Sequence, residues 1–482
     1  MKRLTFLLTT NRNGIQTILP AEDILTFEFD TLDGAPCLLF YADGMVNKEL
    51  LGELIAKPLQ DTALPDGDER KSVALTACRF PEVQELTDFS SCAETILDGN
   101  ALLLIDGISA AFSFGAKSLP VRSIAEPPTD VAVKGPREGF IEDVKTNMVL
   151  LRKRLKTPNL RMEISKVGKQ SNTAVCLCYL DGIVNEGVKK QVEERLQSVE
   201  IDTVPDSSYI ATILAERKHS VFRSVGTTER PDVFAAKLSE GRVGVLVDGS
   251  PIALTLPFAQ VEDFQSNEDY YVSPFMATVF RLLRLFSVLI ALLAPPLYVC
   301  SQLFKMQLLP LNLTLAIAKS TKDIPLSPSM EMFLVLFVLE VLKESSIRMP
   351  KYVGMSLSVV GALVLGDAAV SAGFLSTPTI IVVAFSGICL YAVPNFVETG
   401  SILRWIFLIA AGSLGPFGLT VCVALVLYYM LTADSFGMPL LAPFSPLTLP
   451  DLKDSIPKYS LFSLQKRPRM YGSKNRTRMK RK

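Results

Sequence analysis

The hydrophobic pattern of the chain changes sharply near residue 280, and this change limits the possible folds more than any other feature. Before it, apolar runs are short and alternate with polar turns; after it, long apolar segments follow one another to about residue 437. The segment 282–303 is long enough to cross a hydrocarbon layer of about 30 Å at about 1.5 Å per residue. The sequence therefore predicts an α/β soluble region followed by an all-α polytopic transmembrane bundle.

The soluble region contains an internal repeat. Residues 37–47 reappear as 175–185, and each copy predicts a buried strand, an Asp-Gly turn and an asparagine that caps a helix, over 48–59 and 186–199. A second matching pair, 101–107 and 244–249, again ends in Asp-Gly before another apolar run, which is a hairpin signal. We interpret the soluble region as two similar subdomains; chance similarity between short strands is the alternative.

A proline-rich segment at 122–136 separates the copies, and apolar residues at helical spacing predict a helix over 138–155. Acidic residues come early and basic residues late in this helix, as the helix dipole favours. We expect it to dock between the subdomains, with ligand contact as the alternative. The residues expected to take part in docking are Arg137, Phe140, Glu142, Asn147 and Arg152.

These patterns divide the chain into four predicted parts. They are the first α/β subdomain with its linker (1–134), the linker helix with the second α/β subdomain (135–272), a transmembrane helical domain of four or five spans (273–437) and a basic cytoplasmic tail (438–482).

Several arginines and prolines in the apolar half indicate how its helices are oriented and where they are interrupted. Arg281 and Arg284 stand at the entry of the first span and favour a cytoplasmic start, whereas Pro295 and Pro296 predict a kink or a break within it. Among the remaining apolar runs, 353–374 and 377–393 are expected to span the membrane, and 330–342 leads into a charged segment. The run 308–318 is too short to cross and is expected to re-enter the membrane or lie in its interface. The run 402–431 is either one tilted helix or two segments broken near Gly415-Pro416.

Charged residues within the apolar half are the candidate functional residues. Glu340, Lys343 and Glu344 fall on one helix face, Arg348 follows, and Asp367 sits inside a glycine-rich span. Ionised side chains are costly in a membrane and face a bundle interior, water or a counter-charge. We expect these five residues to form a polar pathway or inter-subunit contacts, and Asp367 to be buried. For the cluster around Glu340, a loop wetted at the headgroups is the alternative.

Composition excludes several classes of function. The net charge is zero, which gives no indication of nucleic-acid binding, and the nine basic residues of 466–482 predict a solvated tail that can also adhere to anionic membrane lipids. The eight cysteines lack framework spacing, His219 is the single histidine, and no phosphate loop, nucleophile elbow or zinc motif occurs. We therefore expect no enzyme activity, no cofactor and no metal. The start of the chain lacks a signal-peptide cleavage pattern, so a cytoplasmic N-terminal region is expected.

Several short motifs together resemble the spore germination receptor A subunit family. They are the segments at 135–142, 146–154, 228–232, 241–251, 268–271, 308–310, 361–369 and 435–437. One segment departs from the family pattern: within 340–350, Lys343 stands where the family has arginine, and Ser345-Ser346 where it has Ala-Gly.

The resemblance implies a multi-pass protein of the spore inner membrane. It implies partnership with a transporter-like B subunit and a lipoprotein C subunit, and a homo-oligomeric ring whose helices form a nutrient-gated cation channel that triggers germination. An accessory family member that modulates dipicolinate release or another receptor is the alternative. A secondary transporter is disfavoured, because no inverted repeat is visible in the apolar half.

Overall fold

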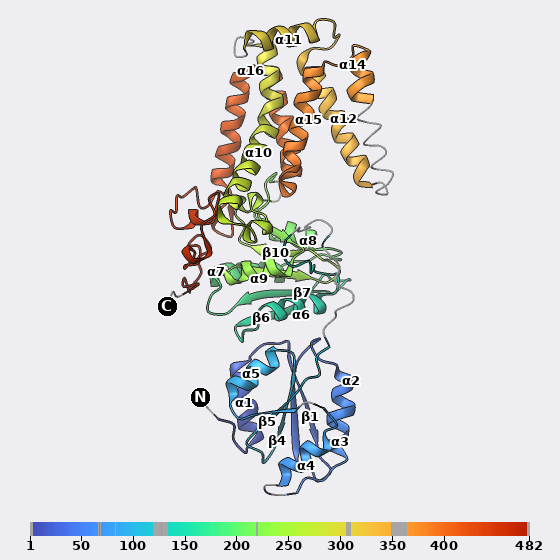
Figure 1. Ribbon diagram of the computed structural model, residues 1–482, viewed down its shortest axis with the longest axis vertical. Helices are drawn as coiled ribbons and strands as arrows, with labels where there is room; N and C mark the ends of the chain where they lie inside the picture. Colours follow the sequence, from blue (N-terminus) through green and yellow to red (C-terminus); the bar gives the residue numbers. More distant parts are fainter. Residues whose placement is uncertain are drawn as a thin grey trace.

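The computed structural model describes residues 3–118 except 66, 68 and 82, residue 127, and residues 134–217, 220–304, 310–348 and 364–479. Figure 1 shows three parts along the long axis of the molecule: one α/β subdomain, a second α/β subdomain and a region of long helices. This arrangement confirms the predicted fold class of two α/β subdomains followed by an all-α region.

The first subdomain is a five-stranded antiparallel sheet with the strand order β1-β2-β4-β5-β3. Its elements are α1 (Leu8–Ile18), β1 (Ile24–Asp30), β2 (Pro36–Ala42), α2 (Lys48–Leu51), a π-helical turn (Gly52–Ala56), α3 (Lys57–Gln60), α4 (Glu69–Ala77), β3 (Val83–Leu86), α5 (Phe89–Leu97), β4 (Ala101–Ile105) and β5 (Ala111–Phe114).

The second subdomain repeats this order as β6-β7-β9-β10-β8. Its elements are α6 (Val144–Arg154), β6 (Leu160–Val167), β7 (Thr173–Leu180), α7 (Glu186–Gln197), α8 (Ser207–Leu214), β8 (Gly226–Thr228), α9 (Pro231–Ser239), β9 (Val243–Val247) and β10 (Ala253–Leu256). The identical strand order confirms the internal repeat, and Asn47 and Asn185 cap their helices as predicted, by accepting from backbone N–H groups of the first turn.

The repeat extends to the helix that precedes each sheet, which the sequence analysis did not detect. Asn11 in α1 forms a two-way clamp with the backbone of Thr5 (2.8 and 2.6 Å), and Asn147 in α6 forms the same clamp with Ile141 (2.9 and 2.5 Å). The predicted linker helix is therefore the first helix of the second subdomain. It begins at Val144 rather than 138, because the extended residue Asp143 accepts from Thr146 N (2.8 Å) and caps it.

The central strands of each sheet are buried on both faces, because helices cover both of them. In the first sheet, Leu38 and Leu102 pack under α1 and α5, whereas Leu39 and Leu103 face the opposite core with Ile55. The central strands β4 and β9 are buried along their whole length. This explains why they appear in the sequence as continuous apolar runs rather than as alternating patterns.

The helical region begins with α10 (Pro274–Leu303), α11 (Leu311–Thr321) and α12 (Pro328–Arg348). It continues with a π-helical turn (Val364–Ala368), α14 (Ala369–Ser371), α15 (Thr377–Tyr391) and α16 (Val397–Thr432). In the described part of the chain, Pro274–Leu303 and Pro394–Thr432 have the length and hydropathy of membrane-crossing helices, and Thr377–Tyr391 is apolar but shorter. Figure 1 shows α11 lying across the far end of the bundle. The expectation that 308–318 re-enters the membrane or lies in the interface stays a prediction.

Two sequence expectations for this region have different outcomes. Pro295 and Pro296 do not break α10, which runs through both. The two prolines are buried where α10 packs against neighbouring helices. Contacts with neighbouring helices allow an apolar helix to contain proline. The first half of the expected span 353–374 lies outside the described residues, which resume at 364.

The chain of α16 folds back on itself at Gly415, so the broken alternative for 402–431 is the one observed. A straight helix of its 36 residues would measure about 54 Å. Yet Thr399 donates to Val221 O (2.8 Å) and Arg217 donates to Thr432 O (2.5 Å), so both ends lie beside the second subdomain. The φ of +64° at Gly415 permits this reversal, which leaves a first arm (397–414) and a second arm (416–432).

The segment after α16 is folded against the second subdomain rather than solvated. It contains β11 (Asp434–Ser435), β12 (Met438–Pro439) and 3-10 turns at Asp451–Lys453 and Leu461–Ser463. Tyr471 is 2% exposed, its carbonyl accepts from Asn185 Nδ2 (3.2 Å), and Arg467 Nε donates to Ser239 O (2.6 Å). The expectation of a solvated tail is therefore wrong for the described part of 466–482 that contains Arg467 and Tyr471, because backbone acceptors of the subdomain take up its donors.

The contact between the two subdomains contains a buried ion pair. Arg152 is 1% exposed and binds both carboxylate oxygens of Asp23 (2.9 and 2.7 Å), while its remaining donors reach Thr157 O and Leu160 O. Because burial of an unpaired charge is costly, each partner requires the other.

We predict that Arg152→Ala lowers the free energy of unfolding by about 3–5 kcal/mol, since it leaves Asp23 buried without a counter-charge. Chemical unfolding of the detergent-solubilised chain, followed by circular dichroism, measures this. Arg161→Ala is the control, because it removes the half-exposed pair with Asp181 (3.3 Å) and should cost at most about 1 kcal/mol. Equal effects of the two substitutions would contradict the prediction.

Candidate functional site

Glu340 and Lys343, predicted from the sequence, are tied to the first arm of α16. Glu340 Oε1 lies 2.8 Å from Arg404 Nη2 and its other oxygen pairs with Lys343, which also donates to Ser401 Oγ (3.0 Å). Three charges thus share one network between α12 and α16. Arg404 is buried, whereas the side chains of Glu340 and Lys343 are 19% and 20% exposed. Because an unpaired charge is costly among apolar helices, this pairing holds α12 against α16.

Arg404, which the sequence analysis did not single out, is the most buried member of this network. It is 2% exposed and its Nη1 donates to Ser386 Oγ on α15 (3.3 Å), which in turn donates to Ala291 O on α10 (2.8 Å). One chain of contacts therefore joins four helices. A lone arginine within the apolar run 402–431 was the signal that could have revealed it.

A second buried carboxylate, Glu331 at the start of α12, was also missed. It is 1% exposed and accepts from the backbone nitrogen of Ser376, the residue that precedes α15. The signal was present in the sequence as an acidic residue at the head of the run 330–342.

The other predicted charges of the helical region lie apart from this network. Glu344 and Arg348 form an exposed pair with each other (2.6 Å) one turn further along α12. Asp367 is exposed on the outside of the helical region, so the expectation that it is buried within this chain is wrong. The structure thus brings together two of the five predicted residues, because α12 presents only Glu340 and Lys343 to α16.

The predicted docking residues also divide into two groups. Phe140 packs edge-on against Phe234, Asn147 clamps the backbone, and Arg152 pairs with the first subdomain. Arg137 and Glu142 are exposed. Helical periodicity identified the buried positions but could not show that the chain is still extended before 144.

The junction between the soluble region and α10 is organised around Asp269, which is fully buried. It accepts from Arg281 Nε (3.0 Å) and from both terminal nitrogens of Arg284 (2.9 and 3.0 Å). Arg281 also reaches Asp454 of the C-terminal segment (3.1 Å), to which Tyr270 donates (3.1 Å). Arg281 and Arg284, which the sequence analysis interpreted as an indication of membrane topology, therefore both bind the carboxylate of Asp269.

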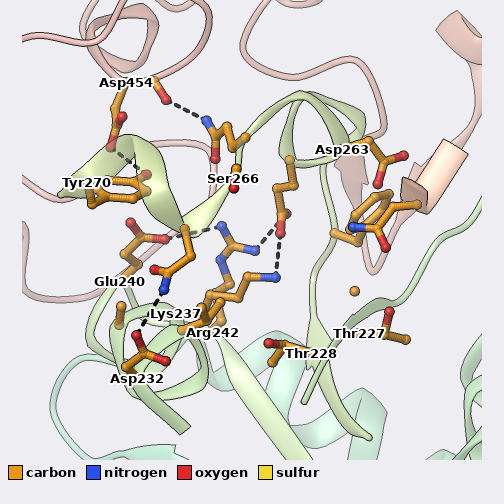
Figure 2. Close-up of a pocket in the computed structure, with 18 of the residues that line it drawn as sticks. Thr227, Thr228, Asp232, Lys237, Glu240, Arg242, Asp263, Ser266, Tyr270 and Asp454 are labelled. Carbon is orange, nitrogen blue, oxygen red and sulfur yellow. Dashed lines mark hydrogen bonds and ion pairs between the residues drawn. The ribbon is translucent and has the colours of Figure 1, made fainter. Parts of the chain in front are cut away.

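A cavity of about 710 Å³ lies beside this cluster, between the second subdomain, the start of α10 and the C-terminal segment. Figure 2 shows Arg242 and Glu240 within its lining. Arg242 forms ion pairs with Glu240 (3.2 Å) and with Glu262 (2.6 Å). Lys237 adds a second cation to Glu262 (2.9 Å), and the Tyr471 hydroxyl contacts Arg242. The cavity walls are thus charged but paired among themselves.

The pKa values of two adjacent carboxyl groups at this cavity, Glu262 and Asp263, are shifted in opposite directions. Burial opposes the ionisation of Glu262, but the charges of Arg242 and Lys237 outweigh it and lower its pKa to about 2. Burial raises the pKa of Asp263 to about 6, although Arg223 opposes the shift. Glu262 is therefore a fixed anion, and Asp263 is the carboxyl group that titrates closer to neutrality.

The chemistry available at this junction is charge pairing and mechanical coupling. Within the described ranges, no group of three or more histidine, cysteine, aspartate or glutamate residues could hold a metal ion. The paired cations and anions connect three separate stretches of chain: the second subdomain, the start of α10 and the C-terminal segment.

We predict that Glu262→Gln destabilises the chain at pH 7 by about 3–5 kcal/mol, because Arg242 and Lys237 lose a buried counter-charge. The folded-state pKa of Glu262 lies below its ordinary value of 4.5, so its contribution is present above pH 4.5 and is lost as the pH falls towards 2. Thermal unfolding at pH 7 and at pH 3 should show the gap between variant and wild type shrinking. Glu200→Gln, in an exposed pair with Lys169, is the control; a pH-independent gap would refute the assignment.

Comparison with known proteins places the chain in a family. The family model described as Bacillus/Clostridium GerA spore germination protein matches residues 15–470. Among curated relatives, "Spore germination protein GerQA" of Bacillus cereus is 35% identical over 467 residues, covering 96% of this chain and 93% of that protein. "Spore germination protein KA" of Bacillus subtilis (strain 168) is 33% identical over 443 residues, covering 91% of this chain and 81% of that protein.

A solved structure, the N-terminal domain of the A subunit of the Bacillus megaterium spore germinant receptor GerK3, is 26% identical in sequence, with a TM-score of 0.43. The match covers 54% of this chain and 98% of that one. From the extent of the family match and the identity to its curated members, the chain belongs to the GerA family of spore germination proteins.

Proposed function

We propose that this chain is the A subunit of a nutrient germinant receptor in the spore inner membrane. In this proposal it crosses the membrane several times with its α/β region in the cytoplasm, and works beside a transporter-like B subunit and a lipoprotein C subunit. Copies of the chain form a ring whose helices provide a nutrient-gated path for cations. Its family membership supports the role in germination.

The observation that carries the channel proposal is the exposure of Asp367 on the helical region. An ionised carboxylate does not remain stable against acyl chains; it requires water or a counter-charge. A position exposed in one copy and surrounded by apolar sequence therefore suits a surface that faces a neighbouring copy or a water-filled path. The exposed pair of Glu344 and Arg348 on α12 fits the same surface requirement.

The internal network supports the same proposal in a different way. Glu340 pairs with both Lys343 and Arg404 within a single copy, so its carboxylate is not free to bind a passing cation. They hold α12 against α16, and through Ser386 they also engage α15 and α10. In this proposal the network fixes the helices that carry the exposed charges.

We predict that Asp367→Asn slows potassium release severalfold in spores that carry this variant as the sole copy, when germination is triggered by nutrient. The matched control is Asp323→Asn, which removes an equally exposed carboxylate from the turn after α11. Ion release is followed in the medium, and immunoblotting confirms equal amounts of protein. Unchanged release from the Asp367 variant would remove this residue from the pathway.

The accessory role makes a different prediction about partners. A receptor subunit should co-purify with a transporter-like B subunit from spore membranes, and copies of its soluble region should cross-link to one another. Failure to recover the B subunit, together with an intact germination response after deletion of the gene, would favour the accessory role instead.

A further inference from the structure

The C-terminal segment exposes an unusual number of large apolar side chains. Between residues 443 and 463, six of them are 41–71% exposed: Phe444, Leu447, Leu449, Tyr459, Leu461 and Phe462. Water-exposed loops rarely gather apolar surface in this way, and contiguous patches mark contacts with other molecules or with a membrane. We refer to residues 443–463 as the collar.

The collar lies at the level where the apolar surface of α10 begins. Lys458 N donates to Thr278 Oγ1 (3.0 Å), and Asp454 pairs with Arg281 (3.1 Å), so the collar follows the first two turns of α10. Phe275 and Leu283, both within the first three turns of α10, are themselves 75% and 56% exposed. Figure 1 shows this segment, in red, beside the ends of α10 and α16 that adjoin the second subdomain.

The exposed charged side chains of the collar and of the residues that follow it are positive. Its two acidic residues are used internally: Asp451 accepts from the backbone nitrogens of Arg469 and Met470 (2.9 Å each), and Asp454 is held by Arg281. No aspartate or glutamate occurs after Asp454 in the sequence. Lys453, Lys466 and Arg469 are exposed. Apolar side chains interleaved with unopposed cations match the boundary between acyl chains and anionic headgroups.

We propose that the collar docks into the surface of an anionic bilayer. Its apolar side chains enter the boundary between headgroups and acyl chains, and Lys453, together with Lys466 and Arg469 just beyond the collar, contacts lipid phosphates. Because Asp454 and Tyr270 connect the collar to the Asp269 cluster, the membrane surface then holds the second subdomain through the C-terminal segment as well as through α10. The proposal rests on the membrane placement of α10 and α16 but not on channel activity.

Fluorescence quenching in reconstituted vesicles tests this inference. The full chain carrying Phe462→Cys, labelled with bimane, is placed in vesicles of phosphatidylcholine and phosphatidylglycerol that contain brominated acyl chains. The control label is at Asn475→Cys, an exposed position beyond the buried Tyr471. Wild type treated with the same reagent gives the background, which should be low because seven of the eight native cysteines are buried.

We expect brominated lipid to quench the label at position 462 at least severalfold more than the label at 475, with weaker quenching when phosphatidylglycerol is omitted. Equal accessibility of both labels to aqueous iodide would overturn the proposal. So would protection of position 462 from iodide without quenching by lipid, which would assign the collar to a protein partner. Failure of the chain to float with the vesicles would overturn the membrane placement of α10 and α16, and with it the proposed function. Flotation without quenching of the label at position 462 would reject only the proposal that the collar docks into the bilayer.

Discussion

The fully buried carboxylate of Asp269 is the constraint on which the arrangement of the second subdomain, α10 and the C-terminal segment depends. A charge at zero exposure is tolerated only with counter-charges and hydrogen bonds in good geometry. Arg281 and Arg284 provide them from the second and third turns of α10, and Arg281 passes the connection on to Asp454. The direction in which α10 leaves the soluble region and the position of the C-terminal segment are thus set by one cluster.

An ion pair between an arginine and a carboxylate also joins the other parts of the molecule. Asp23 with Arg152 joins the two subdomains, Asp269 with Arg281 joins the soluble region to the helices, and Glu340 with Arg404 joins helices to one another. Arg152 binds Asp23 through two directed hydrogen bonds, and Arg284 adds two to Asp269. Arg281 and Arg404 each donate one to their carboxylate. Because these bonds are directed, the pairs define orientation as well as proximity. The molecule is therefore a series of packed units linked by directional, buried contacts, which suits the transfer of a movement from one unit to the next.

Duplication explains much of the soluble region. The two sheets share their strand order, their capping asparagines and the clamp formed by Asn11 and Asn147. The copies nevertheless differ in what surrounds them. The second subdomain carries the charged cavity and receives Tyr471, whereas the first contacts the rest of the chain through Asp23. A common scaffold has acquired different surfaces, and the junction chemistry lies on those surfaces rather than on the sheet.

The sequence by itself determined the local features: the apolar spans, the Asp-Gly turns, the asparagine caps and the repeat of 37–47 at 175–185, because each depends on neighbouring residues and hydrophobic periodicity. It also marked Glu340 and Lys343 as unusual. Only the tertiary structure decided that Arg404 completes their network, that Asp367 is exposed, that α16 reverses at Gly415 and that the basic C-terminal segment is folded. These outcomes depend on pairs such as Asn185 and Tyr471, which are 286 residues apart. The energy of a buried charge is set by the partner that reaches it in space, and no local pattern specifies that partner.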